Sequence, residues 1–181
     1  MNKNRFQFLS ILFVVLRIIF APLILINVYL STLGSLFLDG MDGLIFSKAN
    51  VSRSSYQIID KILDFYWYFW IFLYLTINSP GDFLYYLFTI FFLIRLVGEV
   101  FFLIKGKRKI FILFPNLFEL FFWVYLLSNL LGLGALLLPP FLWFIIIICT
   151  VLKLFQEYLA HVANFSFFNF IFKRKVLVWK N

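Results

Sequence analysis

The sequence predicts an all-α integral membrane protein, a bundle of six transmembrane helices with both termini in the cytoplasm. Hydrophobic residues make up 64% of the 181 residues and charged residues only 13%. A soluble domain is about 45–50% apolar and about 25% charged. So few charged residues could not cover so much apolar surface in water. The composition therefore indicates a protein whose surface lies in a lipid bilayer. We expect one membrane domain covering residues 1–181.

Long apolar runs set the number of spans, since a helix needs about 20 mostly apolar residues to cross a bilayer. The first run follows a short basic N-terminus and is expected to be retained as a span. Proline and glycine mark later boundaries, with a turn at 78–82 and a break between 131 and 140. The predicted spans cover residues 6–30, 32–47, 58–77, 83–104, 110–131 and 139–159.

The basic residues predict the orientation of these spans. The connections near residues 31, 80 and 135 contain no Lys or Arg. Basic and non-basic ends therefore alternate, as the positive-inside rule requires for an even number of spans. We attribute the net charge of +8 to the basic connections and termini on the cytoplasmic side, and we expect no nucleic-acid binding. The basic residues that lie outside the spans or in the first turn of the third span are Lys3, Arg5, Lys48, Arg53, Lys61, Lys105, Lys107, Arg108, Lys109, Lys173, Arg174, Lys175 and Lys180.

Four of the five aspartates lie at the adjoining ends of two neighbouring spans. Asp39 and Asp42 end the second span, and Asp60 and Asp64 begin the third. Each pair is about one helical turn apart and so shares a helix face, and the short connection allows the two faces to meet. Carboxylates crowded in a poorly hydrated site repel one another, so either their pKa values rise or cations lie between them. Oxygen ligands suit hard cations, so we expect two divalent ions, Mg²⁺ or Mn²⁺.

A simpler interpretation of the first pair is a turn. Asp is a good helix cap, and Asp-Gly is a common turn pair. This would explain Asp39, Asp42 and Gly43, but it would not explain the second pair on the next span at the same side of the membrane.

The spacing of these residues resembles the signature of the CDP-alcohol phosphatidyltransferase family. In that signature, Asp, two residues, Asp-Gly, two residues and Ala-Arg are followed after a short interval by Gly, three residues, Asp, three residues and Asp. All four aspartates and Gly43 match this pattern without a gap. Arg17 and Pro22 in the first span also resemble the first helix of the family.

The chain departs from the signature at three positions. Phe46-Ser47 stands where the family has Ala-Arg, and Tyr56 stands where it has its second Gly. The family's Arg helps to hold the phosphates of the nucleotide. We therefore expect Gly43, Ser47, Lys48 and Arg53 to bind the nucleotide, with Gly43 allowing close approach of the backbone. Alternatively, Lys48 and Arg53 only anchor the loop in the cytoplasm.

The resemblance implies an enzyme of phospholipid biosynthesis whose site faces the cytoplasm. It would transfer a phosphatidyl or phospho-alcohol group from a CDP-linked lipid or a CDP-alcohol to an alcohol acceptor and release CMP. The resemblance also implies that Asp39 and Asp60 bridge two metal ions, that Asp42 binds the first and Asp64 the second, and that Asp64 is the general base. Family members are often homodimers.

Two other functions stay open. The altered motif positions favour a catalytically inactive or repurposed relative. A small membrane transporter or proton relay would also use buried acids, but it would need polar residues along a path through the membrane. The predicted spans are instead nearly free of charge in their non-cytoplasmic halves.

Two further ionisable residues lie inside the fourth predicted span. Arg95 and Glu99 are four residues apart, so they can share a helix face and pair. Together with Tyr56 they could line a pocket for the acceptor or for a phosphate. Alternatively, the pair only holds helices together.

Overall fold

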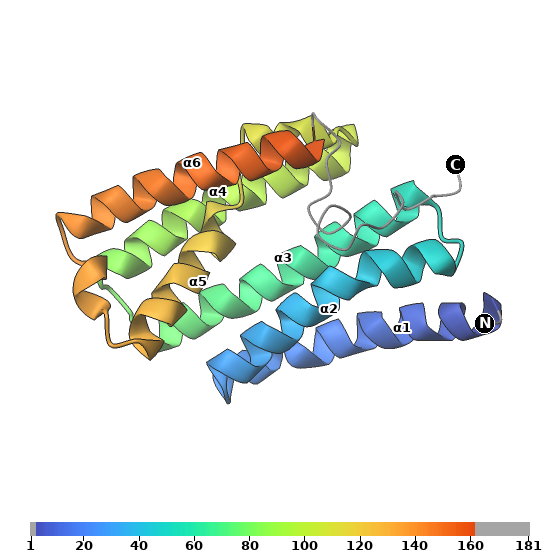
Figure 1. Cartoon of the computed structure of the whole chain (residues 1–181), viewed down its shortest axis with the longest axis horizontal. Coiled ribbons are helices and arrows are strands. Elements are labelled where there is room, and N and C mark those ends of the chain that lie inside the picture. The colour runs from blue at the N-terminus through green and yellow to red at the C-terminus, as the bar shows by residue number, and fades with distance from the viewer. Residues whose placement is uncertain (1–2, 162–181) are drawn as a thin grey trace. The chain divides into compact units, whose positions relative to one another are not determined.

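The computed structural model describes residues 3–161, and these form helices joined by short connections, with no strand among them (Figure 1). The all-α prediction is therefore confirmed for this part of the chain. Three short 3-10 helices lie between the longer ones: η1 (Pro22–Leu25), η2 (Arg108–Ile112) and η3 (Gly134–Leu137). The α-helices are α1 (Lys3–Phe20), α2 (Val28–Lys48), α3 (Arg53–Asn78), α4 (Phe83–Lys105), α5 (Leu117–Leu130) and α6 (Phe141–His161).

The described chain divides into two compact units. The first unit, up to residue 78, contains α1, η1, α2 and α3, and α1 contacts both of the other helices (Figure 1). The second unit, from residue 79, contains α4, η2, α5, η3 and α6, and α5 contacts both α4 and α6. The candidate site lies within the first unit.

The predicted first span, 6–30, was wrong at its end. The helix α1 stops at Phe20, and Pro22 begins the 3-10 turn η1. Proline lacks the N–H that a continuing helix would need, but it fits the first turn of a new one. A new helix then begins after Asn27, whose side chain accepts a hydrogen bond from the Leu30 N–H at 2.9 Å. The Ser31 hydroxyl donates to the Phe20 carbonyl at 2.5 Å and so ties the start of α2 to the end of α1.

The connection between α2 and α3 is shorter than predicted. The second span was expected at 32–47 and the third at 58–77, whereas α2 covers Val28–Lys48 and α3 begins at Arg53. Only residues 49–52 lie between the two helices, and Asn50 takes the left-handed conformation with φ 59°. This short turn keeps the end of α2 beside the start of α3, where the two aspartate pairs are.

The predicted fifth span, 110–131, was wrong at its start. Gly106 ends α4 in the left-handed conformation, and its N–H donates to the Phe102 carbonyl at 2.7 Å. The chain then forms η2, and α5 begins only after Pro115 and Asn116, so that α5 has 14 residues. The fourth and sixth spans agree closely with α4 and α6.

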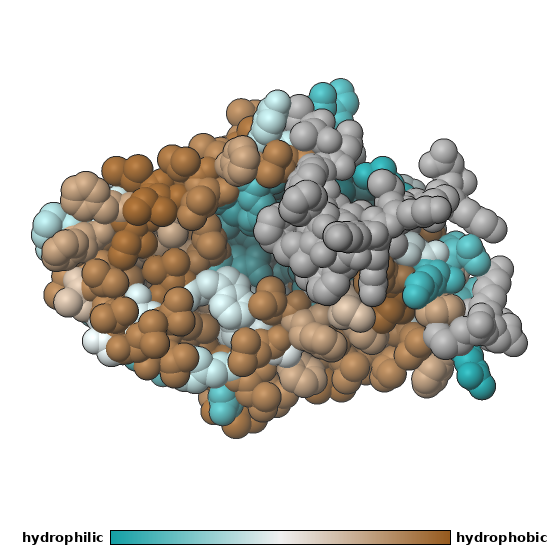
Figure 2. Space-filling view, viewed as in Figure 1, coloured by the Kyte–Doolittle hydropathy of each residue, from teal (hydrophilic) through white to brown (hydrophobic). Residues whose placement is uncertain are grey.

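The length and apolar character of the helices are consistent with a membrane protein. Three candidate membrane-spanning helices are present among the described residues: Arg5–Leu25, Phe83–Lys105 and Phe141–Leu159. The helix α5 is apolar but shorter. Large apolar side chains, such as Ile11, Ile104 and Phe144, are exposed, and apolar residues cover much of the face shown in Figure 2. Lipid tolerates such a surface, whereas water does not.

A buried ion pair lies within α4, as the sequence predicted. Nη2 of Arg95 lies 2.7 Å from Oε1 of Glu99, and both side chains are almost fully buried. The guanidinium carbon of Arg95 is also 4.4 Å from the ring centroid of Phe111, which η2 contributes. The pair therefore links α4 to the turn that follows it.

We predict that Glu99→Gln destabilises the second unit, because it leaves the buried charge of Arg95 without this carboxylate. The expected loss is about 3–5 kcal/mol in the free energy of unfolding. Urea or thermal unfolding of the purified protein in detergent measures it. The control is Lys153→Gln, which removes a longer, 3.8 Å pair with Glu157 and should cost less than about 1 kcal/mol. Equal stability of Glu99→Gln and the wild type would contradict the prediction.

Candidate functional site

Four aspartates from two helices meet around one arginine from a third. We call Asp39, Asp42, Asp60 and Asp64 the aspartate cluster. Nη1 of Arg17 pairs with Oδ2 of Asp42 and lies 3.5 Å from Oδ1 of Asp60. Nη2 of Arg17 lies 3.1 Å from Oδ1 of Asp39 and 2.7 Å from Oδ1 of Asp64. Thus α1 supplies the cation, while α2 and α3 supply two carboxylates each.

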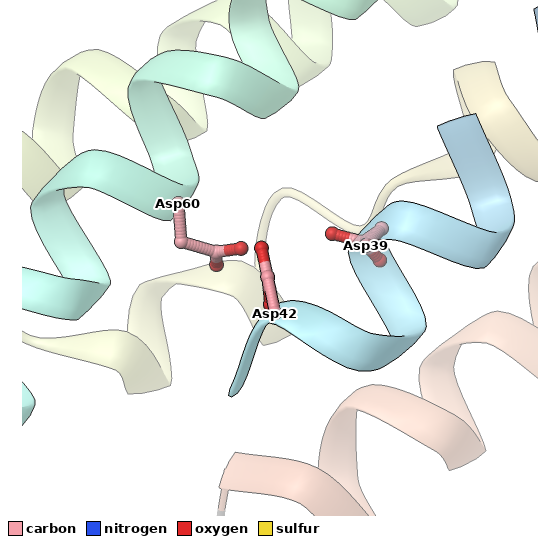
Figure 3. A group of neighbouring side chains, drawn as sticks. All are labelled: Asp39, Asp42 and Asp60. Carbon is pink, nitrogen blue, oxygen red and sulfur yellow. The ribbon is translucent and has the colours of Figure 1, made fainter. Parts of the chain in front are cut away.

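The helical register explains why the carboxylates converge. Asp39 and Asp42 lie about one turn apart on α2, and Asp60 and Asp64 lie about one turn apart on α3. Figure 3 shows the carboxylates of Asp42 and Asp60 pointing toward each other from α2 and α3, with Asp39 one turn away along α2. The structure therefore brings the two predicted pairs together.

The cluster is buried on one side and open on the other. The side chain of Asp42 is 2% exposed, and those of Asp60 and Asp64 are 11% and 12% exposed. The Asp39 side chain, in contrast, is 49% exposed. A small ion or a phosphate group could therefore approach the cluster from the side of Asp39.

A second cation reaches the cluster from α3 itself. Nζ of Lys61 lies 3.0 Å from Oδ2 of Asp60 and also pairs with Oδ2 of Asp64. Four carboxylates carry a formal charge of −4, and Arg17 and Lys61 together carry +2, so the six residues retain −2. One divalent cation would neutralise this remaining charge.

Three of the aspartates fit such a cation. One oxygen each from Asp39, Asp42 and Asp60, the three-aspartate site, lies within 4.8 Å of the others (Figure 3). Carboxylate oxygens are the ligands that Mg²⁺ and Mn²⁺ prefer. Asp64 lies outside this group of three and pairs with Arg17 and Lys61. The donor set thus fits one hard divalent cation, and the second predicted ion stays a prediction.

Two residues that depart from the family signature pack against each other beside the cluster. The rings of Phe46 and Tyr56 have centroids 5.3 Å apart. The Tyr56 hydroxyl donates a hydrogen bond to Oδ1 of Asp42 at 2.7 Å. Burial raises the pKa of Tyr56 above its ordinary value, so the hydroxyl keeps its proton and remains a donor.

Gly43 leaves the room that this tyrosine occupies. A Cβ atom at residue 43 would lie 3.2 Å from the Tyr56 hydroxyl oxygen, closer than such contacts normally are. The space beside the Gly43 backbone is therefore taken up by the Tyr56 side chain. Close approach of a nucleotide to the Gly43 backbone stays a prediction.

Within residues 3–161, no contact with the aspartate cluster is seen for Ser47, Lys48 or Arg53, the residues predicted to hold the nucleotide together with Gly43. The Ser47 hydroxyl donates to the Leu44 carbonyl at 2.9 Å within α2. Nζ of Lys48 lies 5.4 Å from the ring centroid of Phe6 on α1, and Arg53 is exposed at the start of α3. The cations that pair with the cluster are instead Arg17 and Lys61. Nucleotide binding by Ser47, Lys48 and Arg53 stays a prediction.

Arg95 and Glu99 lie in the second unit, where they pair with each other. Their prediction as part of an acceptor or phosphate pocket with Tyr56 stays untested.

The sequence analysis missed two contacts. Arg17 was identified only by its place in the first span and by its resemblance to the first helix of the family, and Lys61 only as a topological charge. An arginine inside an apolar run needs a carboxylate or another polar partner, so the sequence did contain a signal. It could not identify the partners, because Asp39, Asp42, Asp60 and Asp64 lie between 22 and 47 residues further along the chain.

No family model matches this chain, and neither does any curated protein or solved structure. Any proposal about function therefore depends on the residues of the cluster and their geometry.

We predict that Tyr56→Phe destabilises the first unit, because the buried Asp42 carboxylate loses a hydrogen bond. The expected loss is about 1–3 kcal/mol in the free energy of unfolding, measured by chemical unfolding in detergent. Tyr66→Phe is the matched control on the same helix, since the Tyr66 hydroxyl is exposed and makes a long, 3.4 Å bond to the Ile18 carbonyl. An equal loss in the two variants would refute a specific role for the Tyr56 bond.

Proposed function

We propose that this protein is a membrane enzyme that transfers a phosphatidyl or phospho-alcohol group from a CDP-linked donor to an alcohol. One observation carries the proposal: four aspartates, paired on two consecutive helices, converge on one point in the first unit. Their spacing is the one by which the sequence resembles the CDP-alcohol phosphatidyltransferases.

The three-aspartate site would hold a divalent cation, Mg²⁺ or Mn²⁺. When bound, such an ion neutralises charge on the donor's pyrophosphate and on the leaving CMP. The remaining negative charge of the cluster favours this, since −2 is the charge that one divalent ion balances. The charge of a second ion would be neutralised by the negative charge of the donor's pyrophosphate.

Asp64 is the proposed general base. It lies outside the three-aspartate site, so its carboxylate is not needed as a ligand there and can act on the acceptor hydroxyl. In the reaction, the acceptor oxygen forms a bond to phosphorus as its proton passes to the Asp64 carboxylate. The bond between phosphorus and the CMP oxygen breaks, and CMP leaves with the electron pair.

A site at the edge of the membrane suits one lipid substrate and one water-soluble substrate. We propose six spans with the cluster facing the cytoplasm. Support comes from the alternating basic connections, from the three candidate membrane-spanning helices, and from the partial exposure of Asp39. A homodimer, as is common among family members, is part of the same proposal.

A catalytically inactive relative is the second candidate. It is favoured by the contacts of Arg17 with all four aspartates, which give the cluster a structural role without any ion. Release of CMP separates the two candidates, because only the enzyme produces it.

We predict that the purified protein releases CMP from CDP-diacylglycerol, or from a CDP-alcohol with diacylglycerol, when Mn²⁺ and a suitable alcohol are present. Asp42→Asn or Asp60→Asn should lower the rate at least about a hundredfold, because the site loses a ligand. Asp82→Asn is the control, since Asp82 lies outside the cluster, at the start of α4. Failure to release CMP with any of a panel of small alcohols would refute the proposed enzymatic activity and favour the inactive relative.

We predict that Asp64→Asn slows transfer by about 10²–10⁴-fold even at saturating Mn²⁺, since it removes a base and leaves the ligands of the three-aspartate site in place. A direct Mn²⁺ titration gives the saturating concentration, and steady-state CMP release at that concentration measures the rate. Wild-type turnover in this variant would remove the base assignment.

A further inference from the structure

The carboxylates that fit a divalent cation are already bonded to an arginine. Nη1 of Arg17 contacts Asp42 and Asp60, and Nη2 contacts Asp39 at 3.1 Å. Every member of the three-aspartate site is therefore a partner of the same guanidinium. The Arg17 side chain is only 8% exposed, so it lies inside the cluster and does not cover it from solvent.

A cation in the three-aspartate site would come close to Arg17. The guanidinium cannot lose its proton under ordinary conditions, so it stays positively charged. Two cations a few ångströms apart repel strongly where water is scarce. The ion and Arg17 therefore compete for the same three carboxylates. Lys61 competes less, because Asp60 is the one member of the site with which it pairs, and its other partner is Asp64.

We propose that Arg17 is an internal counter-ion that a divalent cation must displace from the three-aspartate site, and that Arg17 thereby sets the affinity of the site. This inference depends on the proposed binding of a divalent cation. Without an ion, the guanidinium keeps the four carboxylates from repelling one another. With an ion, Asp64 remains as its partner, since Nη2 lies 2.7 Å from Oδ1 of Asp64, outside the three.

The displacement also connects ion binding to the packing of α1. Arg17 forms ion pairs from α1 to both α2 and α3. An ion that takes over the three carboxylates leaves Arg17 paired with Asp64. Binding of the ion therefore loosens the ionic contact between α1 and α2, while the apolar packing between the helices remains.

A purely structural arginine would behave in the opposite way. If Arg17 only held the carboxylates in place for the ion, its removal would let them move apart and would weaken ion binding. If Arg17 competes with the ion, its removal strengthens ion binding. The sign of the change in affinity distinguishes the two roles.

The test is a titration of the purified full-length protein with Mn²⁺, in which the free ion is followed by electron paramagnetic resonance. Each protein is purified with Mn²⁺, stripped with a chelator and titrated again. Arg17→Gln should bind Mn²⁺ at least about tenfold more tightly than the wild type, because a nearby positive charge is gone. Arg17→Lys should lie between the two, since a single ammonium cannot contact four carboxylates at once.

The matched control is Arg5→Gln, which removes the same charge from the same helix. Arg5 is exposed and lies about 18 Å from Arg17 along the helix axis. This variant should bind Mn²⁺ as the wild type does. A change in Arg5→Gln equal to that in Arg17→Gln would overturn the proposal, because it would show an effect of net charge alone.

Thermal unfolding with and without Mn²⁺ gives a second measurement. Arg17→Gln should unfold at a lower temperature than the wild type without the ion and gain more stability from Mn²⁺. If Arg17→Gln stays folded only with Mn²⁺, Arg17→Lys takes its place in the titration, and Mn²⁺ binding no tighter than that of the wild type would overturn the competition. Equal or weaker Mn²⁺ binding by folded Arg17→Gln would overturn the competition alone. Absence of Mn²⁺ binding in both folded proteins would overturn the proposed metal site as well.

Discussion

The contact of Arg17 with four carboxylates is the interaction on which the first unit depends. Two aspartates on α2 and two on α3 could not approach one another in a poorly hydrated site without positive charge between them. Arg17 supplies that charge from α1, and Lys61 adds more from α3. The geometry of this unit is therefore set by charge as well as by apolar packing. An arginine suits this position because its fork of donors reaches several acceptors at once.

The same contact limits what the cluster can bind. Two positive side chains leave the six residues with a charge of −2, and the half-exposed side chain of Asp39 gives access to the cluster. A site of this kind retains an attraction for a divalent ion without carrying the full repulsion of four bare carboxylates. It differs from an acidic patch on a surface, whose charges water and salt would screen.

The residues at which this chain differs from the signature that it resembles contact one another in the structure. Phe46 and Tyr56 stand where smaller residues are usual in the signature, and their rings pack against each other. The tyrosine hydroxyl then bonds to Asp42, in room that Gly43 leaves beside it. The two aromatic rings thus pack beside Asp42, the most buried of the four aspartates, and the Tyr56 hydroxyl has a hydrogen-bond partner. Substrates that use this side of the cluster would meet aromatic rings.

The fold class, the membrane character and the two aspartate pairs could be predicted from the sequence. Composition and helical periodicity are local properties, so no tertiary contact was needed to predict them. The point where α1 gives way to η1, the length of the turn before Arg53 and the identity of the cations in the cluster depend instead on tertiary contacts. Arg17 meets carboxylates up to 47 residues away because α1 packs against both α2 and α3. Such a meeting depends on how whole helices pack, which the pattern of a single helix does not specify.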